Sequence, residues 1–480
     1  MSETPEGKNK ESIKKVGEFK ESEEIEKTKG TGESEEVENR SVEQKLSDSH
    51  DNILTKKKIV VVFGAMAIAL LLTFVDQTSI TVSLPYIADD LNAHDTISWA
   101  GTSSLISNTV FMVLFGRFSD IFSRKYIMVS AMIILAFFDL ACGLSQTPTQ
   151  FYIFRGFCGI GNGGITSLTM VIVSDIVSLE DRGKYQGILG AFVGLGNAIG
   201  PFIASAFIQH STWRKFYYTM FPLILSATAV IITLVPYTKP NQTVKEKLKS
   251  VDYLGFLTSS ISIIFLLIPI SGGGSTFTWN GGFVISMIII GGLFSIFFVL
   301  VEYKFAKLPL IPLRLFNNEM SLTLLLTQNF FFGICYYSAL YYYPYYFELI
   351  KGNSAIITSC YFLALVIPQS LFSIFCGQII SRTKHYWYVL WFGYGVWLIA
   401  LGLTNLWKVN NNCGINIITL ILNGMGVGSI FQPTLVAAQA HSFKKDRATV
   451  ISTRNVLRSF GGAIGLAISS TIIVNSFNKH

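Results

Sequence analysis

Charged side chains are scarce in this sequence. Asp, Glu, Lys and Arg make up 14% of its 480 residues, whereas 50% of the residues are hydrophobic. A soluble domain carries about a quarter charged residues to cover its surface, so the shortage excludes a water-exposed globular protein and predicts lipid as the main surrounding. The net charge of +7 does not indicate a nucleic-acid partner, because the basic residues lie in short clusters between apolar runs.

The sequence also lacks the signatures of enzymatic chemistry. It contains no Gly-x-x-x-x-Gly-Lys-Ser/Thr segment for a nucleotide phosphate, and no metal-ligand or nucleophile pattern. The six cysteines have no pairing pattern and all except Cys413 lie in apolar runs, which predicts packing rather than disulfides. The histidines avoid those runs, so we expect any proton carrier within the membrane to be a carboxylate. We predict neither an enzyme nor a cofactor or metal site.

The N-terminal segment has too few hydrophobic residues to form a core. Met1–Asp51 is rich in Glu, Lys and Ser and nearly free of aromatic residues, a composition typical of disorder. It has no apolar stretch of the kind found in a signal peptide. We therefore predict that residues 1–55 form a disordered tail on the cytosolic side.

Thirteen runs of roughly 20 mostly apolar residues predict membrane-spanning helices. They lie near 59–87, 97–116, 126–145, 151–173, 187–208, 216–236, 253–270, 282–301, 320–347, 355–380, 386–406, 415–437 and 449–476. With a cytosolic N-terminus, cytosolic loops and flanks carry about 20 Lys and Arg against about five outside, which follows the positive-inside rule. The predicted fold class is an all-α polytopic membrane protein.

An internal repeat divides the spans into halves. With an offset of about 265 residues, Asp181-Arg182 recurs as Asp446-Arg447, and a second set of matches pairs Gly159, Gly161 and Gly163 with Gly424, Gly426 and Gly428. Paired repeats with a substrate site between them are typical of secondary transporters. We predict an N-terminal bundle of six spans over 56–237, a two-helix insert with cytosolic loops over 238–318, and a C-terminal bundle over 319–480.

Three ionisable residues within or beside the spans are candidate functional groups, because a charge in hydrocarbon is costly. Asp76 lies deep in the first span, followed by Thr78, whose hydroxyl can bond nearby groups. Arg155 begins the fourth span, and Asp139 lies in the outer part of the third. The alternatives are a structural hydrogen bond for Asp76, an interfacial anchor for Arg155 and a solvated helix end for Asp139.

Glycines recur in the fifth span, at Gly190, Gly194, Gly196 and Gly200, and Pro201 follows directly. Glycines permit close approach of helix backbones and proline bends a helix. The pattern predicts either a hinge that lets helices slide or ordinary packing of small residues.

The loop after the second span carries an acid among bases. Gly116, Asp120, Arg124 and Lys125 form a tight turn that predicts an ionic latch between neighbouring helices. Positive-inside charge alone explains the two cations but not Asp120.

These segments together resemble the major facilitator superfamily. The loop resembles its Gly-x-x-x-Asp-x-x-x-Arg-Lys motif, Arg155 and Gly159 resemble its Arg-x-x-x-Gly element, and Gly200-Pro201 resembles the end of its antiporter motif. The Asp-x-Thr…Leu-Pro run from Asp76 and the two additional spans are similar to the fungal fourteen-span drug:proton antiporters. The resemblance implies two six-helix-type bundles that export a small organic solute by alternating access in exchange for protons. It assigns proton or substrate contact to Asp76, Thr78 and Arg155, gating to the loop and a hinge to the fifth span.

The sequence departs from this pattern in places. Ala204-Ser205 stands where a Gly-Gly pair is usual, Ser123 replaces a glycine of the loop, and the chain stops at His480 after the thirteenth span, so we expect the fourteenth to be missing. A vacuolar transporter of basic amino acids and a transport-inactive sensor are the alternatives. We expect the protein to lie in the plasma membrane or the vacuolar membrane. The aromatic-rich ninth span predicts either a site for organic cations or packing. The expected partners are a small-molecule substrate, protons and membrane lipid, with no nucleic acid, and we expect a monomer.

Overall fold

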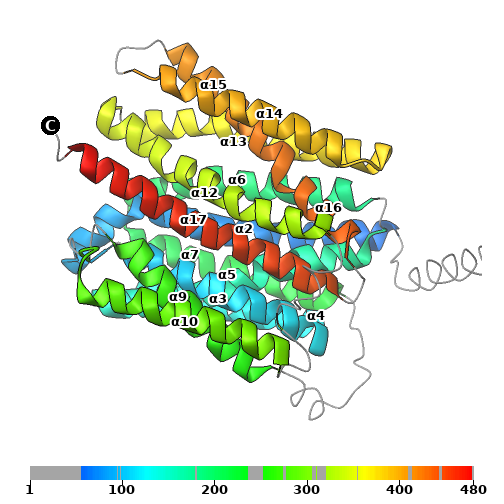
Figure 1. Cartoon of the computed structure of the whole chain (residues 1–480). Helices are drawn as coiled ribbons and strands as arrows, with labels where there is room; N and C mark the ends of the chain where they lie inside the picture. Colours follow the sequence, from blue (N-terminus) through cyan, green and yellow to red (C-terminus); the bar gives the residue numbers. More distant parts are fainter. Residues whose placement is uncertain are drawn as a thin grey trace, which may run out of the picture. The chain divides into compact units, whose positions relative to one another are not determined.

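Residues from Thr55 onward form one compact helical unit (Figure 1). The computed structural model describes residues 56–93, 96–97, 99–178, 181–235, 252–273, 277–304, 310, 320–353, 355–408, 413–442 and 446–477. Within these ranges the β pairing is limited to one isolated bridge between Gly273 and Phe277. The tail predicted for residues 1–55 lies outside the described residues.

The helices follow the predicted spans to within a few residues. Among the described residues, ten helices are long and apolar enough to cross a membrane on length and composition. The first half contains α2 (Lys56–Leu91), α3 (Trp99–Ile121), α4 (Arg124–Leu144), α5 (Pro148–Ile176), α6 (Arg182–His210) and α7 (Trp213–Leu234). The later helices are α9 (Tyr253–Gly272), α10 (Gly282–Lys304), α12 (Met320–Tyr345), α13 (Ala355–Thr383), α14 (Trp387–Leu403), α15 (Cys413–Phe431), α16 (Pro433–Ala440) and α17 (Arg447–Phe477). The all-α polytopic prediction is confirmed.

Prolines shape two of the later segments. The single span predicted over 415–437 is divided, because Pro433 lacks the N–H that would continue α15 and instead begins α16. At the end of α12, Pro344 precedes a π-helical turn over Tyr346–Ile350. Such turns widen a helix locally and are frequent at functional sites.

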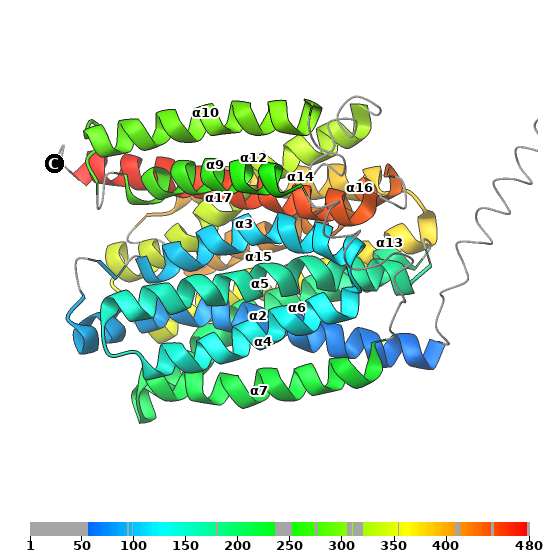
Figure 2. The same ribbon diagram turned by 90° about the horizontal axis from the view of Figure 1, so that it is seen from below.

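Burial separates central helices from peripheral ones. In the most apolar window of α5, 83% of the residues are buried inside the protein, against 22% in α10. Helix α5 packs against α3 and α4, whereas α10 packs mainly on α9, which in turn contacts α3 and α17 (Figure 2). The large hydrophobic side chains exposed on α10 are Ile, Leu, Phe, Val and Tyr, as expected for a surface that faces lipid.

The two halves contact each other through α6 with α13 and through α3 with α17. Glycines make the first contact close: a Cβ on Gly183 would lie 2.7 Å from the carbonyl oxygen of Gly377. Ser373 of α13 donates a hydrogen bond to the carbonyl oxygen of Gly187 at 2.9 Å. Small residues and such inter-helix hydrogen bonds are the usual means of holding helices together in lipid.

Candidate functional site

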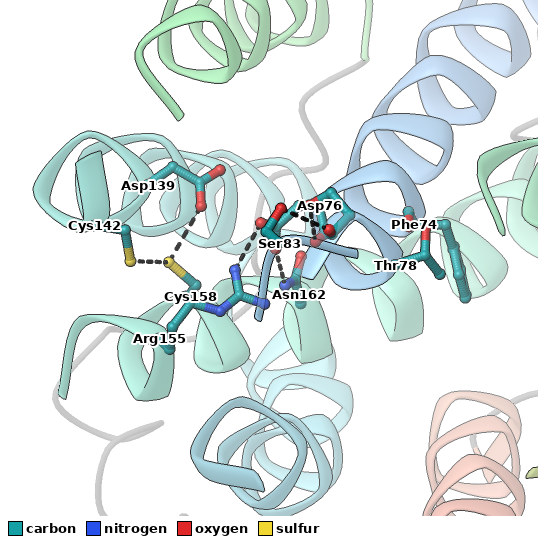
Figure 3. A network of polar contacts seen from close by, with 10 residues as sticks. Phe74, Asp76, Thr78, Ser83, Asp139, Cys142, Arg155, Cys158 and Asn162 are labelled. Carbon is teal, nitrogen blue, oxygen red and sulfur yellow. Dashed lines mark hydrogen bonds and ion pairs between the residues drawn. The ribbon is translucent and has the colours of Figure 1, made fainter. Parts of the chain in front are cut away.

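Asp76 lies at the centre of a buried polar network on α2 (Figure 3). Arg155 Nη1 donates to Asp76 Oδ1 at 2.7 Å, and Asn162 Nδ2 donates to Oδ2 at 2.8 Å. The exposed fractions of Asp76, Arg155 and Asn162 are 0%, 1% and 0%. Arg155 and Asn162 are seven residues apart, which places both on one face of α5. The arginine is therefore buried against a carboxylate and does not extend toward an interface.

Thr78 faces another helix. Its hydroxyl donates to the carbonyl oxygen of Phe74 at 2.7 Å and lies 3.3 Å from that of Gly196 on α6. In Figure 3, Thr78 and Phe74 lie apart from the Asp76 network. The structure thus places Thr78 in the α2–α6 contact and not beside Asp76.

Asp139 of α4 is fully buried, with an exposed fraction of 0%, which excludes the solvated helix end considered from the sequence. Its Oδ1 accepts a hydrogen bond from the Cys158 thiol at 3.3 Å, and Cys158 Sγ lies 3.9 Å from Cys142 Sγ. Its Oδ2 has no hydrogen-bond partner. Asp139 and the Asp76 network occupy one region because Cys158 follows Arg155 by three residues on α5 (Figure 3).

A second buried cluster lies on α17, and the sequence analysis missed it. Arg454 is 1% exposed and Arg458 is 4% exposed. Arg454 donates to Thr434 Oγ1 at 3.0 Å, to Asn455 Oδ1 at 3.2 Å and to the carbonyl oxygen of Phe431. The guanidinium of Arg458 lies 4.6 Å from the centre of the Phe431 ring. In the described part of the chain, no ion pair joins either arginine to a carboxylate.

Uncharged polar groups accompany these arginines. Gln432, at the break between α15 and α16, is 1% exposed, and neither atom of its amide has a partner. The Nε atoms of Arg454 and Arg458 are also buried and unpaired. Buried polar atoms normally have partners, so each such atom calls for an explanation such as a ligand or water.

The loop predicted as a latch lies at the end of the bundle where α5 ends and α6 begins. Arg124 forms an ion pair with Asp175 of α5, a residue that the sequence analysis did not single out. Lys125 is half-buried. Gly116 lies against Ser452, where α3 meets α17. The side chain of Asp120 is outside the described part of the chain.

Two hydrogen bonds join the halves at or near the same end. Ser174 donates to Gln439 of α16 at 3.0 Å, and the hydroxyls of Ser167 and Ser452 lie 3.0 Å apart. All four side chains are buried. Among the described residues, these bonds hold the two halves together at this end of the bundle.

The glycines of α6 divide between two neighbours. A Cβ on Gly190 or Gly194 would meet Ser373 or Ser370 of α13, and one on Gly196 or Gly200 would meet α2. Pro201 lies inside α6, which continues as a helix to His210. The predicted hinge segment thus lies between α2 on one side and α13 on the other.

Comparison with known proteins decides the family, because residues 66–466 match the Major Facilitator Superfamily. The chain belongs to this superfamily. It is 49% identical over 431 residues, 89% of its own length, to Citrate exporter 1 of Yarrowia lipolytica, and spans 64% of the length of that relative. It is 30% identical over 421 residues to Efflux pump dotC of Dothistroma septosporum, covering 88% of this chain and 72% of the pump.

Solved structures of the superfamily share the fold. The proton:xylose symporter XylE superposes with a TM-score of 0.62 at 13% identity, covering 89% of this chain and 90% of the symporter. The human organic anion transporter MFSD10 superposes with a TM-score of 0.58 at 16% identity, covering 86% of this chain and 93% of that transporter. Members of the superfamily are transporters and not enzymes, and this major facilitator protein is an integral, multi-pass membrane protein.

Some residues of this major facilitator protein could have been found from its sequence. Arg447, Arg454 and Arg458 follow one another at spacings of seven and four residues, which places them on one face of a helix. Nothing in the sequence indicates that Asn162 and Cys158 belong to a functional site, since amides and thiols are common in packed helices. Only their position opposite Asp76 and Asp139 distinguishes them.

Proposed function

We propose that this chain is a secondary active transporter of an organic anion that carries two or more carboxylates, with citrate as the leading candidate. The observation that carries the proposal is the pair of buried arginines on α17. A buried charge without a partner is strongly unfavourable, and a partner of opposite charge removes much of that cost. Guanidinium groups bind carboxylates through paired hydrogen bonds.

The spacing of the two arginines suits a substrate with more than one carboxylate. Arg454 and Arg458 are four residues apart on α17, so their Cβ atoms are about 5–6 Å apart on one helix face. Each guanidinium can bind one carboxylate of the same molecule, and the unpaired amide of Gln432 can bond a hydroxyl or a third carboxylate. The relative named a citrate exporter supports this assignment.

The arrangement disfavours a cationic cargo. Two arginines that have no carboxylate partner among the described residues repel a basic amino acid or a cationic drug, which weighs against the alternatives taken from the fungal antiporter group. Proton-coupled efflux of an uncharged organic compound remains the second candidate, because the relative at 30% identity is named an efflux pump. The aromatic side chains of α12 would then provide the contact surface.

The transport cycle that we propose uses the two halves as moving bundles. Residues 56–237 and 319–480 form the bundles, and 238–318 contribute the two-helix insert. The N-terminus and the closed end bearing Arg124 face the cytosol, in the plasma or vacuolar membrane. Binding of a proton by Asp76 would neutralise the partner of Arg155 and thereby link the pH gradient to the conformational change.

Transport by the purified protein in proteoliposomes tests this proposal. We expect uptake of radiolabelled citrate, stimulated by a pH gradient, and little uptake of lysine or of a cationic dye. Arg454→Gln and Arg458→Gln should each lose citrate uptake, whereas Arg382→Gln, a change of an exposed arginine at the end of α13, should not. Uptake of lysine or the dye in place of citrate would show that the substrate assignment is wrong.

A further inference from the structure

Among the described residues, the Asp76 region contains two buried carboxylates, Asp76 and Asp139, and one buried guanidinium, that of Arg155. Both oxygens of Asp76 accept hydrogen bonds, one from Arg155 and one from Asn162. The Oδ1 atom of Asp139 accepts a hydrogen bond from the Cys158 thiol at 3.3 Å, whereas its Oδ2 atom has no partner in the described part of the chain. Arg155 also has an unpaired buried nitrogen, Nε. One arginine thus lies near two acids and is bonded to one of them.

The charges of this region balance only with one additional proton. The titratable and charged groups around Asp139 are Cys142 on its own helix, Cys158 and Arg155 on α5, Asp76 on α2, and Tyr217 on α7. Arg155 is the sole cation among these groups. If both acids were ionised, the cluster would hold a net charge of −1 away from water, which is strongly unfavourable. Two carboxyl groups at one site repel each other when both are ionised, which favours the state in which one of them keeps a proton.

We propose that Asp139 is a proton-binding residue of the transporter, and that Arg155 alternates between Asp76 and Asp139. In this scheme, Asp139 carries the proton while Arg155 is paired with Asp76, as in the structure. When a proton binds Asp76, the N–H groups of Arg155 turn to Asp139, whose own proton leaves. One proton enters and one leaves, so the cluster is neutral before and after the exchange.

This exchange links protonation to helix position. Asp76 lies on α2, Asp139 on α4 and Arg155 on α5 between them. Turning the guanidinium removes the strong bond between α5 and α2 and forms one between α5 and α4. Helix α2 also packs on α6, so the exchange changes the restraint on the helix that contacts the opposite half. The inference rests on the proposed transport function only for this last step.

Infrared spectroscopy of the purified protein tests the proton site without any substrate. A protonated carboxylic acid has a carbonyl stretching band that a carboxylate lacks. At neutral pH we expect this band in the unmodified protein and its loss in Asp139→Asn. It should persist in Asp90→Asn, which changes an exposed acid paired with Arg214. Absence of the band, or its persistence in Asp139→Asn, would overturn the proposal.

The alternation of Arg155 makes a sharper prediction for two further variants. In Asp76→Asn one acid and one arginine remain, so Asp139 should ionise and the band should disappear. In Arg155→Gln no cation remains, so both acids should be protonated and the band should grow. If the band is unchanged in Asp76→Asn, Asp139 is protonated independently of Arg155 and the exchange is wrong.

Transport assays then separate this inference from the proposed function. In proteoliposomes, Asp139→Asn should retain counterflow of citrate at equal pH but lose uptake driven by a pH gradient. Gradient-driven uptake equal to that of the unmodified protein would contradict a role for Asp139 in coupling. If the unmodified protein moves no citrate at all, the substrate proposal fails while the infrared result still decides the proton site.

Discussion

The two halves share a scaffold and differ in charge. Gly159 and Gly163 of α5 approach the backbone of α3, and their repeat partners Gly424 and Gly428 of α15 approach the backbone of α13. The same offset carries Arg155 onto Leu420 and Asn162 onto Val427, both apolar and buried. The close helix packing has thus been kept in both halves, while the ion pair exists in one.

The arginine pair shows the reverse asymmetry. Arg454 and Arg458 of α17 correspond by the same offset to Leu189 and Val193 of α6, which are 0% and 1% exposed. The buried arginines of each half therefore occupy positions that are hydrophobic in the other half. The repeated glycines mark positions where both halves need close helix contact. The buried charges mark positions where the two halves differ. The proposed proton site and the proposed anion site thus lie in different halves.

The largest effect that can test this comparison comes from replacing each arginine with its apolar counterpart. Arg155→Leu leaves Asp76 buried without its cation and should destabilise the protein by about 3–5 kcal/mol. Arg458→Leu removes a charge that has no carboxylate partner in the described residues, so its effect on stability should be small or favourable. Thermal unfolding in detergent measures both.

The double variant Asp76→Asn with Arg155→Leu provides the control for this experiment. It removes both charges and should recover much of the stability lost in Arg155→Leu. An equal loss of stability in Arg458→Leu and Arg155→Leu would mean that the two clusters do not differ in the way proposed.

Hydropathy predicted the helices but not the pairing within the site. A bilayer requires about 20 apolar residues for each span, so the spans could be located from composition alone. Asp76 and Arg155 were found because each is ionisable in an apolar run. Their contact could not be predicted, because 79 residues separate them along the chain and their distance depends on how α2 and α5 pack. Arg454 and Arg458 were not singled out, although they lie four residues apart on one helix face.

The shared glycines provide the second test, with a smaller effect. A Cβ on Gly200 would lie 2.8 Å from the carbonyl oxygen of Val75, and one on its repeat partner Gly465 would lie 2.8 Å from Ile334 Cα. Gly200→Leu and Gly465→Leu should each cost about 1–3 kcal/mol of stability through overpacking. Each should also slow the proposed citrate transport, because the helices can no longer approach. Similar effects on unfolding and turnover would confirm a common scaffold role, whereas normal turnover in Gly200→Leu would exclude a hinge there.

The smallest expected effect concerns the loop that precedes α4. Arg124 pairs with Asp175, but both side chains are partly exposed, at 24% and 37%, and such pairs contribute about 0–1 kcal/mol. Two hydrogen bonds between the halves lie at or near the same end, so a small loss there shifts the balance between closed and open forms and does not unfold the protein. Asp175→Asn should raise the open population by up to about fivefold. We predict a shift in the same direction for Asp120→Asn, as expected for a latch.

Cysteine labelling can measure this shift. Ala448→Cys introduces a thiol at a buried position of α17 at this end, in a protein whose exposed cysteines Cys335, Cys360 and Cys413 have been replaced by serine. The thiol should react faster with a reagent applied from this side when Asp175→Asn is added. Asp90→Asn, which breaks an ion pair elsewhere, should leave the rate unchanged. If transport falls in Asp175→Asn or Asp120→Asn without faster labelling, these acids act on another step and the latch interpretation is wrong.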